Sequence, residues 1–198
     1  MDKIEICNIA LGRIGVANIE RIDEASEAAR LCNRYYDFTR SNVLERFPWT
    51  FAARREQLAL LDVTPTPDFK YAYRYPQDAL CIQKMFNQHF VGYPWQNQYK
   101  IAGDKEGRVI YTNIENAWIE YTANVSDASQ FDAQFIEALS WKLAAEIAYA
   151  LTGNTQLMQM CVQAYNAYFA EAKSKDADEE NIHDAVLDRL ADARFSEV

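Results

Sequence analysis

The spacing of hydrophobic positions changes from helical to strand-like and back to helical along the chain. In residues 4–14 the apolar side chains recur every three or four positions, which predicts a short N-terminal helix. A longer apolar stripe of helical period follows over residues 25–47. Asp23 is the expected N-cap of this second helix, and Pro48 is expected to end it. The sequence therefore begins with two predicted helices.

The middle third of the chain has the two-residue period of β-strands. In residues 70–75 tyrosines alternate with other residues, which predicts a strand with two unlike faces. Further strands are predicted at 80–86, 99–102, 108–112 and 117–123. The last two of these are expected to form a hairpin across residues 113–116. The middle third is therefore predicted to be a small, mostly antiparallel sheet.

Helical spacing returns at about Asp132. Apolar residues of the segment 131–151 fall on nearly all faces of the expected helix, which indicates burial in a core or between subunits. Gly153 is expected to cap the end of this helix. Asn154 or Thr155 is then expected to begin a fourth helix, so that the chain has two predicted helices on each side of the sheet.

These elements predict an α+β fold that is mainly α. Two N-terminal and two C-terminal helices, in 1–53 and 130–175, are expected to form one helical bundle, because neither pair alone can bury its apolar stripes. A small antiparallel β insertion is expected at 54–125. The residues 176–198 are expected to form an acidic C-terminal helical tail, and the whole of 1–198 to be a single domain.

Charge limits the partners that the chain is expected to bind. The sequence has 29 Asp and Glu against 20 Lys and Arg, a formal net charge of −9. Such a chain repels nucleic acid and anionic lipid at long range, which disfavours tight DNA binding. Double-stranded DNA can still pass an acidic surface transiently and without specific binding. Since no apolar run approaches the roughly 20 residues of a membrane span, no membrane partner is expected.

Cysteine usage and the first residues indicate where the protein is made. Four separated cysteines without a CxxC pair are predicted to be reduced thiols that fill core space: Cys7, Cys32, Cys81 and Cys161. The segment Met1–Glu5 is acidic and amphipathic, unlike a cleaved signal peptide. Synthesis in a cytoplasm is therefore expected.

Motifs of catalysis, metal binding and cofactor binding give no prediction of such a site. The nucleophile elbow GxSxG and the phosphate-binding loops GxGxxG and GxxxxGK[ST] do not occur in the sequence. The two histidines, His89 and His183, stand apart, whereas a zinc site needs about four ligands. A metal site built from His183, Asp184 and Asp188 is the remaining alternative. A carboxylate pair of the glycosidase kind has no local sequence signature, so it stays an open alternative.

The concentrated basic segment is Arg46–Arg55, in which Arg alternates with Trp and Phe. Because Arg and Trp are favoured anchors of protein interfaces, Trp49, Arg54 and Arg55 are predicted to contact a partner. One alternative is that these side chains stack on nucleic acid. The other is that the arginines only compensate the negative C-terminal end of the preceding helix's dipole. The tail adds an apolar stripe on an acidic body, which indicates either a segment that orders on a partner or a solvated terminus. Its predicted interface residues are Val186, Leu187 and Leu190.

Four blocks of residues carry a resemblance to a known family. The first is Ala10–Gly15, and the second is Tyr36-Asp37, Arg40, Leu44, Pro48-Trp49, Phe51-Ala52, Arg54 and Leu58-Ala59. The third is Tyr73, Pro76, Asp78 and Leu80, and the fourth is Tyr121, Asp127, Phe131, Phe135 and 139–148. In this order and spacing they resemble the tail tubular protein A family, the head-to-tail connectors of short-tailed bacteriophages. The resemblance covers about residues 10 to 153 and leaves out the loop 87–107 and the tail.

The resemblance implies a structural protein and not an enzyme. It implies a helical bundle with a β insertion that assembles as a dodecameric ring in the virion, between the portal protein and the tail nozzle protein. Double-stranded DNA would pass through this ring during genome ejection. The alternatives are a neck or completion protein of another tail type, a phage wall hydrolase, and a cellular helical adaptor.

Overall fold

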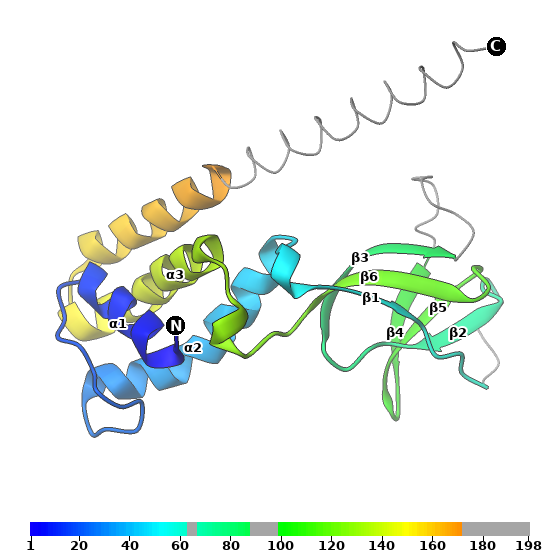
Figure 1. The fold of residues 1–198 in the computed structure, drawn as a ribbon, viewed down its shortest axis with the longest axis horizontal. Helices are drawn as coiled ribbons and strands as arrows, with labels where there is room; N and C mark the ends of the chain where they lie inside the picture. The colour runs from blue at the N-terminus through cyan, green and yellow to red at the C-terminus, as the bar shows by residue number, and fades with distance from the viewer. Residues whose placement is uncertain (63–66, 88–98, 172–198) are drawn as a thin grey trace, which may run out of the picture. The chain divides into compact units, whose positions relative to one another are not determined.

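The computed structural model describes residues 1–62, 67–87 and 99–171 (Figure 1). The chain divides into two compact units. The helical unit consists of Met1–Tyr36 together with the described residues from Ala133 onward, and the β unit consists of Asp37–Asp132. The division falls within the second helix, α2 (Glu27–Arg46), so that its first half belongs to the helical unit and its second half to the β unit.

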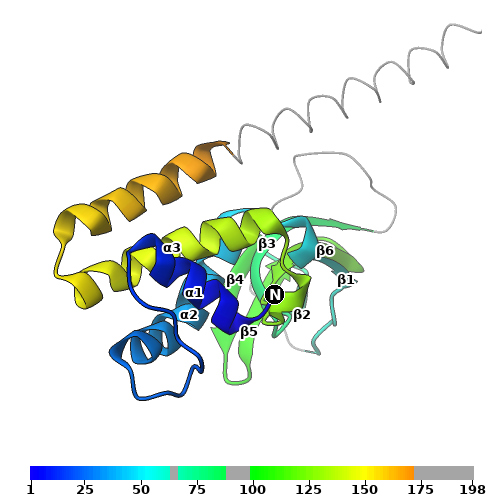
Figure 2. The ribbon, with the colours of Figure 1, turned by 60° about the vertical axis from the view of Figure 1, so that its left-hand side comes forward.

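The helical unit contains α1 (Lys3–Arg13), α3 (Ala133–Thr152) and a further helix at residues 155–171. Helix α1 packs on α3, and the two lie close together in Figure 2. The start of α1 is fixed by a capping box between Asp2 and Glu5. The Asp2 carboxylate accepts from the Glu5 N–H at 2.8 Å, and the Glu5 carboxylate accepts from the Asp2 N–H at 2.7 Å. Two N–H groups that the helix leaves unpaired are thereby satisfied.

Helix α2 begins later than the sequence predicts. The Ser26 hydroxyl accepts from the Ala29 N–H at 3.1 Å, as an N-cap side chain does. The predicted cap, Asp23, instead pairs with Arg21, with 2.6 Å between its carboxylate and the guanidinium. The prediction of Asp23 as the cap is therefore wrong, because a nearby Arg competes for its carboxylate.

The end of α3 confirms the predicted glycine cap. Gly153 has a φ of +64°, and its N–H donates to the Tyr149 carbonyl at 2.8 Å. This is the left-handed C-terminal cap that favours glycine. The Asn154 side chain then accepts from the Leu157 N–H at 3.1 Å and caps the 155–171 helix, as predicted.

The β unit holds most of the departure from the predicted fold. Its strands are β1 (Ala53–Gln57), β2 (Tyr71–Arg74), β3 (Ala79–Asn87), β4 (Tyr99–Asp104), β5 (Gly107–Thr112) and β6 (Ala117–Ala123). Short 3-10 turns at Thr50–Ala52 and Ala128–Gln130 flank them. In the described residues these strands form two three-stranded antiparallel sheets, in the orders β1-β6-β3 and β2-β5-β4. The chain is thus a mixed α/β protein, and the prediction of a helical bundle with a small β insertion is wrong.

The physical reason is that the strands supply a core of their own. In β6, the central strand of its sheet, Ala117, Ile119, Tyr121 and Ala123 are all buried. None of the residues of the outer strand β1 is buried: four are exposed and one is half-buried, as suits a charged edge strand. Because residues 37–132 bury apolar surface among themselves, they form a separate unit rather than an insertion supported by helices.

The predicted hairpin between residues 108–112 and 117–123 does not form. Both segments are strands, but β5 pairs with β2 and β4, whereas β6 pairs with β1 and β3. The link 113–116 therefore leads from one sheet to the other, and Asn116 turns the backbone with a φ of +51°. The hairpin that does form joins β4 to β5, with Asp104 opposite Gly107 in the register. Gly107 has a φ of +138°, which only glycine adopts readily.

Candidate functional site

Trp49, the first predicted interface residue, lies inside the β unit. Only 2% of its surface is exposed, and its indole Nε1 donates to the Val43 carbonyl at 2.9 Å. The rings of Phe47 and Phe51 lie 4.8 and 6.4 Å from it, centroid to centroid. Since Pro48 ends the helix, the chain turns there and the indole packs against the last turns of α2. This side chain therefore braces the turn between α2 and β1 from within.

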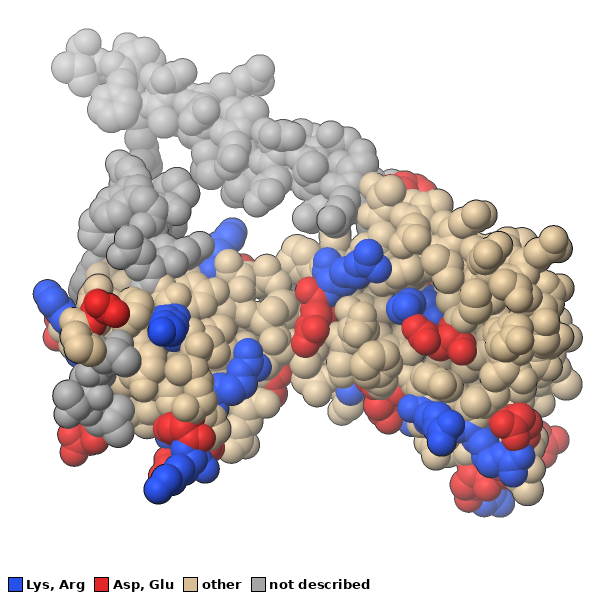
Figure 3. Space-filling model, turned by 180° about the vertical axis from the view of Figure 1, so that it is seen from behind, with Lys and Arg blue, Asp and Glu red and all other residues tan. Residues whose placement is uncertain are grey.

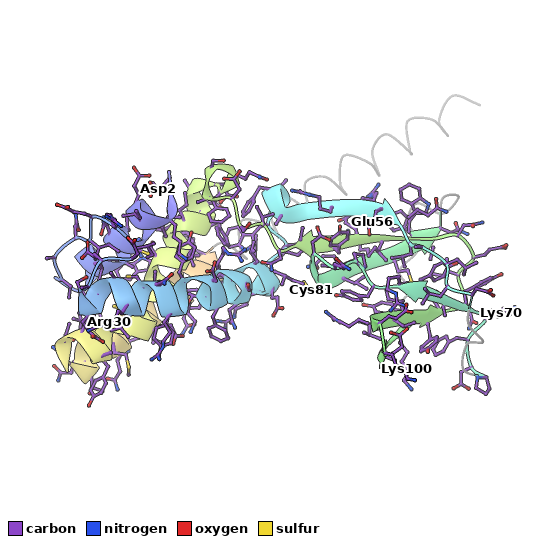
Figure 4. The ribbon with its side chains drawn as sticks, turned by 90° about the horizontal axis from the view of Figure 1, so that it is seen from below. Asp2, Arg30, Glu56, Lys70, Cys81 and Lys100 are labelled. Atoms are coloured by element: carbon purple, nitrogen blue, oxygen red, sulfur yellow. The ribbon has the colours of Figure 1, made fainter. Side chains whose placement is uncertain are left out.

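Arg54 and Arg55 remain on the surface of β1 (Figure 4, where Glu56 is the labelled residue of this strand). The Arg54 guanidinium donates to the carbonyls of Phe51 and Ala53, both at 2.9 Å. Arg55 pairs with Glu120 at 2.8 Å and lies over the ring of Phe86 at 4.9 Å. Successive residues of a strand point to opposite faces, so the two arginines do not form one patch. Their role as interface residues stays a prediction.

A buried arginine that was not among the predicted site residues joins α2 to the end of β6. Arg40 is 5% exposed, and its Nη1 donates to the Asn124 side chain at 2.8 Å and to the Val125 carbonyl. The Asp37 carboxylate lies 3.6 Å from its Nε. A charged donor held by these acceptors ties the second half of α2 to the end of β6, within the β unit.

Tyr121, in the middle of β6, links three parts of the β unit. Its hydroxyl lies 3.1 Å from a carboxylate oxygen of Asp78 and 3.5 Å from one of Glu56. Burial, together with the negative charges of Glu56 and Asp78, raises the pKa of the Tyr121 phenol. A phenol that stays protonated donates hydrogen bonds at neutral pH and is poorly suited to proton transfer. The cluster therefore acts as a structural tie from β6 to β1 and to the turn before β3.

In the helical unit, Arg13 plays a comparable part between α1 and α3. Its guanidinium pairs with Glu137 at 2.8 Å and lies over the Trp141 ring at 3.9 Å from the centroid. Burial lowers the pKa of Arg13, and the Glu137 carboxylate opposes that shift, so the side chain remains charged. The cation therefore holds the last turn of α1 on α3.

The four cysteines are free thiols, as predicted. Cys7, Cys32 and Cys161 are buried, whereas Cys81 is half-buried on β3. A hydrogen bond with Cys32 and burial raise the pKa of Cys7, which keeps that thiol neutral. Burial likewise raises the pKa of Cys161. The thiols of Cys7 and Cys161 are therefore held in the unreactive neutral form, because the thiolate is the nucleophile.

The part of the chain that the structure describes has neither a metal-binding cluster nor a membrane-spanning helix. Residues 1–62, 67–87 and 99–171 contain no group of three or more His, Cys, Asp or Glu able to hold a metal ion. No helix among them is long and apolar enough to cross a bilayer. The predicted tail residues Val186, Leu187 and Leu190 lie outside the described residues. The alternative metal ligands His183, Asp184 and Asp188, and the isolated His89, also lie outside them.

Neither the models of known protein families nor the curated proteins contain a match to this chain.

Proposed function

We propose that this chain is a structural subunit of the head-to-tail connector of a short-tailed phage or prophage. Copies of it would form a ring, a dodecamer in the assembled virion, between the portal protein and the tail nozzle protein, with double-stranded DNA passing through. One observation carries the proposal. Residues from separate blocks of the tail tubular protein A resemblance come together in the β unit.

These contacts join blocks that are far apart in the sequence. Asp78 of the third block accepts a hydrogen bond from Tyr121 of the fourth block at 3.1 Å. In the sheet register, Arg54 of the second block lies opposite this same Tyr121. The second, third and fourth blocks thus come together in one unit, as the motifs of one fold do.

Ring contacts and hydrogen bonds extend the same pattern. The ring of Phe51, from the second block, lies 5.5 Å from that of Phe131, from the fourth. Arg40, also of the second block, donates to Asn124 and Val125, in the segment between Tyr121 and Phe131. The second block thus builds a helix, a Pro-Trp turn and an edge strand, which is the arrangement that the resemblance implies for this stretch.

Charge supports the passage of DNA. A ring whose subunits each carry a net charge of −9 repels the phosphate backbone overall. DNA would therefore move through such a ring without being gripped. Arg54 and Arg55 stand on a strand whose neighbours include Glu56 and Glu120, so the positive charge of β1 is partly balanced locally.

Assembly with portal tests the proposal directly. The full-length chain is purified and mixed with the portal protein encoded in the same genome, and the mass of the products is followed by light scattering and sedimentation velocity. We expect a ring-sized assembly that forms with the portal or by itself, and class averages with rotational symmetry in electron micrographs. The portal of a phage with another tail type serves as the control. A chain that stays monomeric with its own portal, from low to high salt, would contradict the proposal.

A further inference from the structure

Over residues 155–170 the 155–171 helix exposes a face that has no charged side chain, and Glu171 follows at its end. Between Lys142 and Glu171 the sequence has one charged residue, Glu146, although 25% of the whole chain is charged. The exposed side of the helix is built from amide, aliphatic and thioether side chains. Exposed members of this uncharged face are Gln159, Met160, Val162, Gln163, Asn166 and Ala167; Gln163 and Ala167 lie near its middle, and Met160 and Val162 lie on its two flanks.

The opposite side of the same helix is packed into the helical unit. Cys161, Tyr165 and Phe169 are buried, and they follow one another at intervals of four residues. Lys142 of α3 lies over the Tyr165 ring at 5.8 Å and pairs with Glu146 at 2.7 Å. The one charged residue of the segment is thus engaged in an ion pair, and the helix has a settled inner side and a separate outer side.

An uncharged outer side is unusual for a helix that faces water. Exposed helical faces are normally charged or strongly polar, and the cores of protein interfaces are depleted of charge and enriched in Met and aromatic residues. Met160 is 49% exposed and Val162 is 40% exposed. Figure 3 shows a broad area without Lys, Arg, Asp or Glu over this part of the helical unit.

We infer that the uncharged face is the surface through which one copy of this chain contacts a second copy. The inference rests on the proposed ring and names the surface that holds it together. Two copies that each carry a net charge of −9 repel one another over most of their surface. Contact through this face brings no like charges together. The electrostatic repulsion between two acidic copies is therefore lowest when they approach through it.

The size of the face predicts a weak contact. Seventeen residues of helix span about 25 Å, and one helix face buries less than the roughly 800 Å² per partner of a stable complex. A single pair of copies is therefore expected to separate easily. Closing a ring, or binding neighbouring sites on a portal, makes each contact intramolecular and raises its effective concentration. The weak contact thus suits a subunit that assembles on a template.

Introduced negative charge tests the inference in the full-length chain. Met160→Glu and Val162→Glu are compared with Leu60→Glu, a residue of the β unit that is 63% exposed. All three variants add the same charge, and Glu is a better helix former than Val, so folding should be retained and is checked by circular dichroism. We expect both face variants to raise the concentration needed for ring assembly at least tenfold, in sedimentation velocity with portal. The Leu60→Glu control should assemble as the wild type does, and higher salt should restore part of the loss.

A photo-reactive residue at position 163 identifies the occupant. A cross-linked product of twice the monomer mass, formed under assembly conditions, supports contact between copies. A cross-link within one chain, to residues 172–198, overturns the inference. So does normal assembly of both Glu variants; in that case the wild type still assembles and the connector function stands. If the wild type itself does not assemble, the proposed function fails first, and the inference fails with it.

Discussion

Replacing Arg40 by Met tests whether the buried arginine holds the β unit together. Met keeps a flexible apolar side chain of similar length but has no donor for the Asn124 side chain or the Val125 carbonyl. Arg34, an exposed residue of the same helix, provides a matched control as Arg34→Met. The two variants change the same residue type on α2, so any difference between them comes from burial and partners.

The magnitude follows from the contacts. Each hydrogen bond from a charged donor contributes roughly 1.5–3 kcal/mol, and a buried carbonyl left without a partner costs about 1–3 kcal/mol. Burying the Arg40 charge itself costs free energy, and Met has no charge to desolvate. The substitution therefore recovers part of the lost stability. The Asn124 side chain can turn toward water, and Asp37 is exposed, so both acceptors rehydrate. We therefore expect Arg40→Met to lower the free energy of unfolding by about 2–4 kcal/mol.

Urea unfolding measures this loss. With an m-value of about 2 kcal/mol/M, the midpoint should fall by roughly 1–2 M, whereas Arg34→Met should change stability by less than about 0.5 kcal/mol. Circular dichroism and tryptophan fluorescence should be followed together, because two units need not unfold in one step. Equal midpoints for the two variants would refute the reasoning, since Arg40 would then add nothing that an exposed arginine does not.

Two further predictions concern a titrating group and a turn. The raised pKa of Tyr121 means that the folded state keeps this proton when the unfolded state, with a Tyr pKa of about 10, begins to lose it. That contribution is fully present below pH 10 and is lost as the pH rises above it, so Tyr121→Phe should flatten the alkaline fall of unfolding free energy measured in urea; an unchanged slope would contradict this. Gly153→Ala should lower stability by about 1 kcal/mol because of its φ of +64°, whereas Gly12→Ala, inside α1 with open space around it, should be neutral or stabilising by up to about 1 kcal/mol. Thermal melts compare the two glycine variants, and equal shifts would rule out the backbone explanation.

The helix ends were predictable because their signals are local. The capping of α3 by Gly153 and the start of the next helix at Asn154 depend on residues within four positions. The one wrong cap, Asp23, also has a local cause, its pairing with Arg21 two residues away. A prediction that considers only helix capping misses the competition between the helix N–H groups and Arg21 for the Asp23 carboxylate.

Strand pairing was not predictable in the same way. The segments 108–112 and 117–123 each have strand character, and the short link between them favours a hairpin when only neighbours are considered. Their actual partners are β2 and β4 for one, and β1 and β3 for the other. The pairing of each strand depends on how the apolar faces of both sheets are buried across the whole β unit. Local spacing therefore identified the strands but not the two sheets.

The buried clusters were invisible for a related reason. Arg40 lies 84 positions from Asn124, and Tyr121 lies 43 positions from Asp78. No spacing rule connects such pairs, although the resemblance had marked Arg40, Asp78 and Tyr121 in separate blocks. Trp49 stands among arginines in the sequence, and its role as an interface residue stays a prediction. The turn at Pro48 directs the indole inward, onto the Val43 carbonyl.

The place of the proposed subunit contact depends on which surface of the helical unit remains exposed. From the sequence, α3 is the helix expected to contact other subunits, since it is apolar on nearly all faces. In the helical unit nine of the 20 residues of α3 are buried, including Phe135, Leu139, Leu143 and Ile147, so this apolar face is satisfied within one copy. The next helix buries only one side. A charge at one of these buried positions of α3 would destabilise the unit and reveal nothing about assembly, whereas a charge on the outer side of the 155–171 helix leaves the core intact and changes only what meets that face.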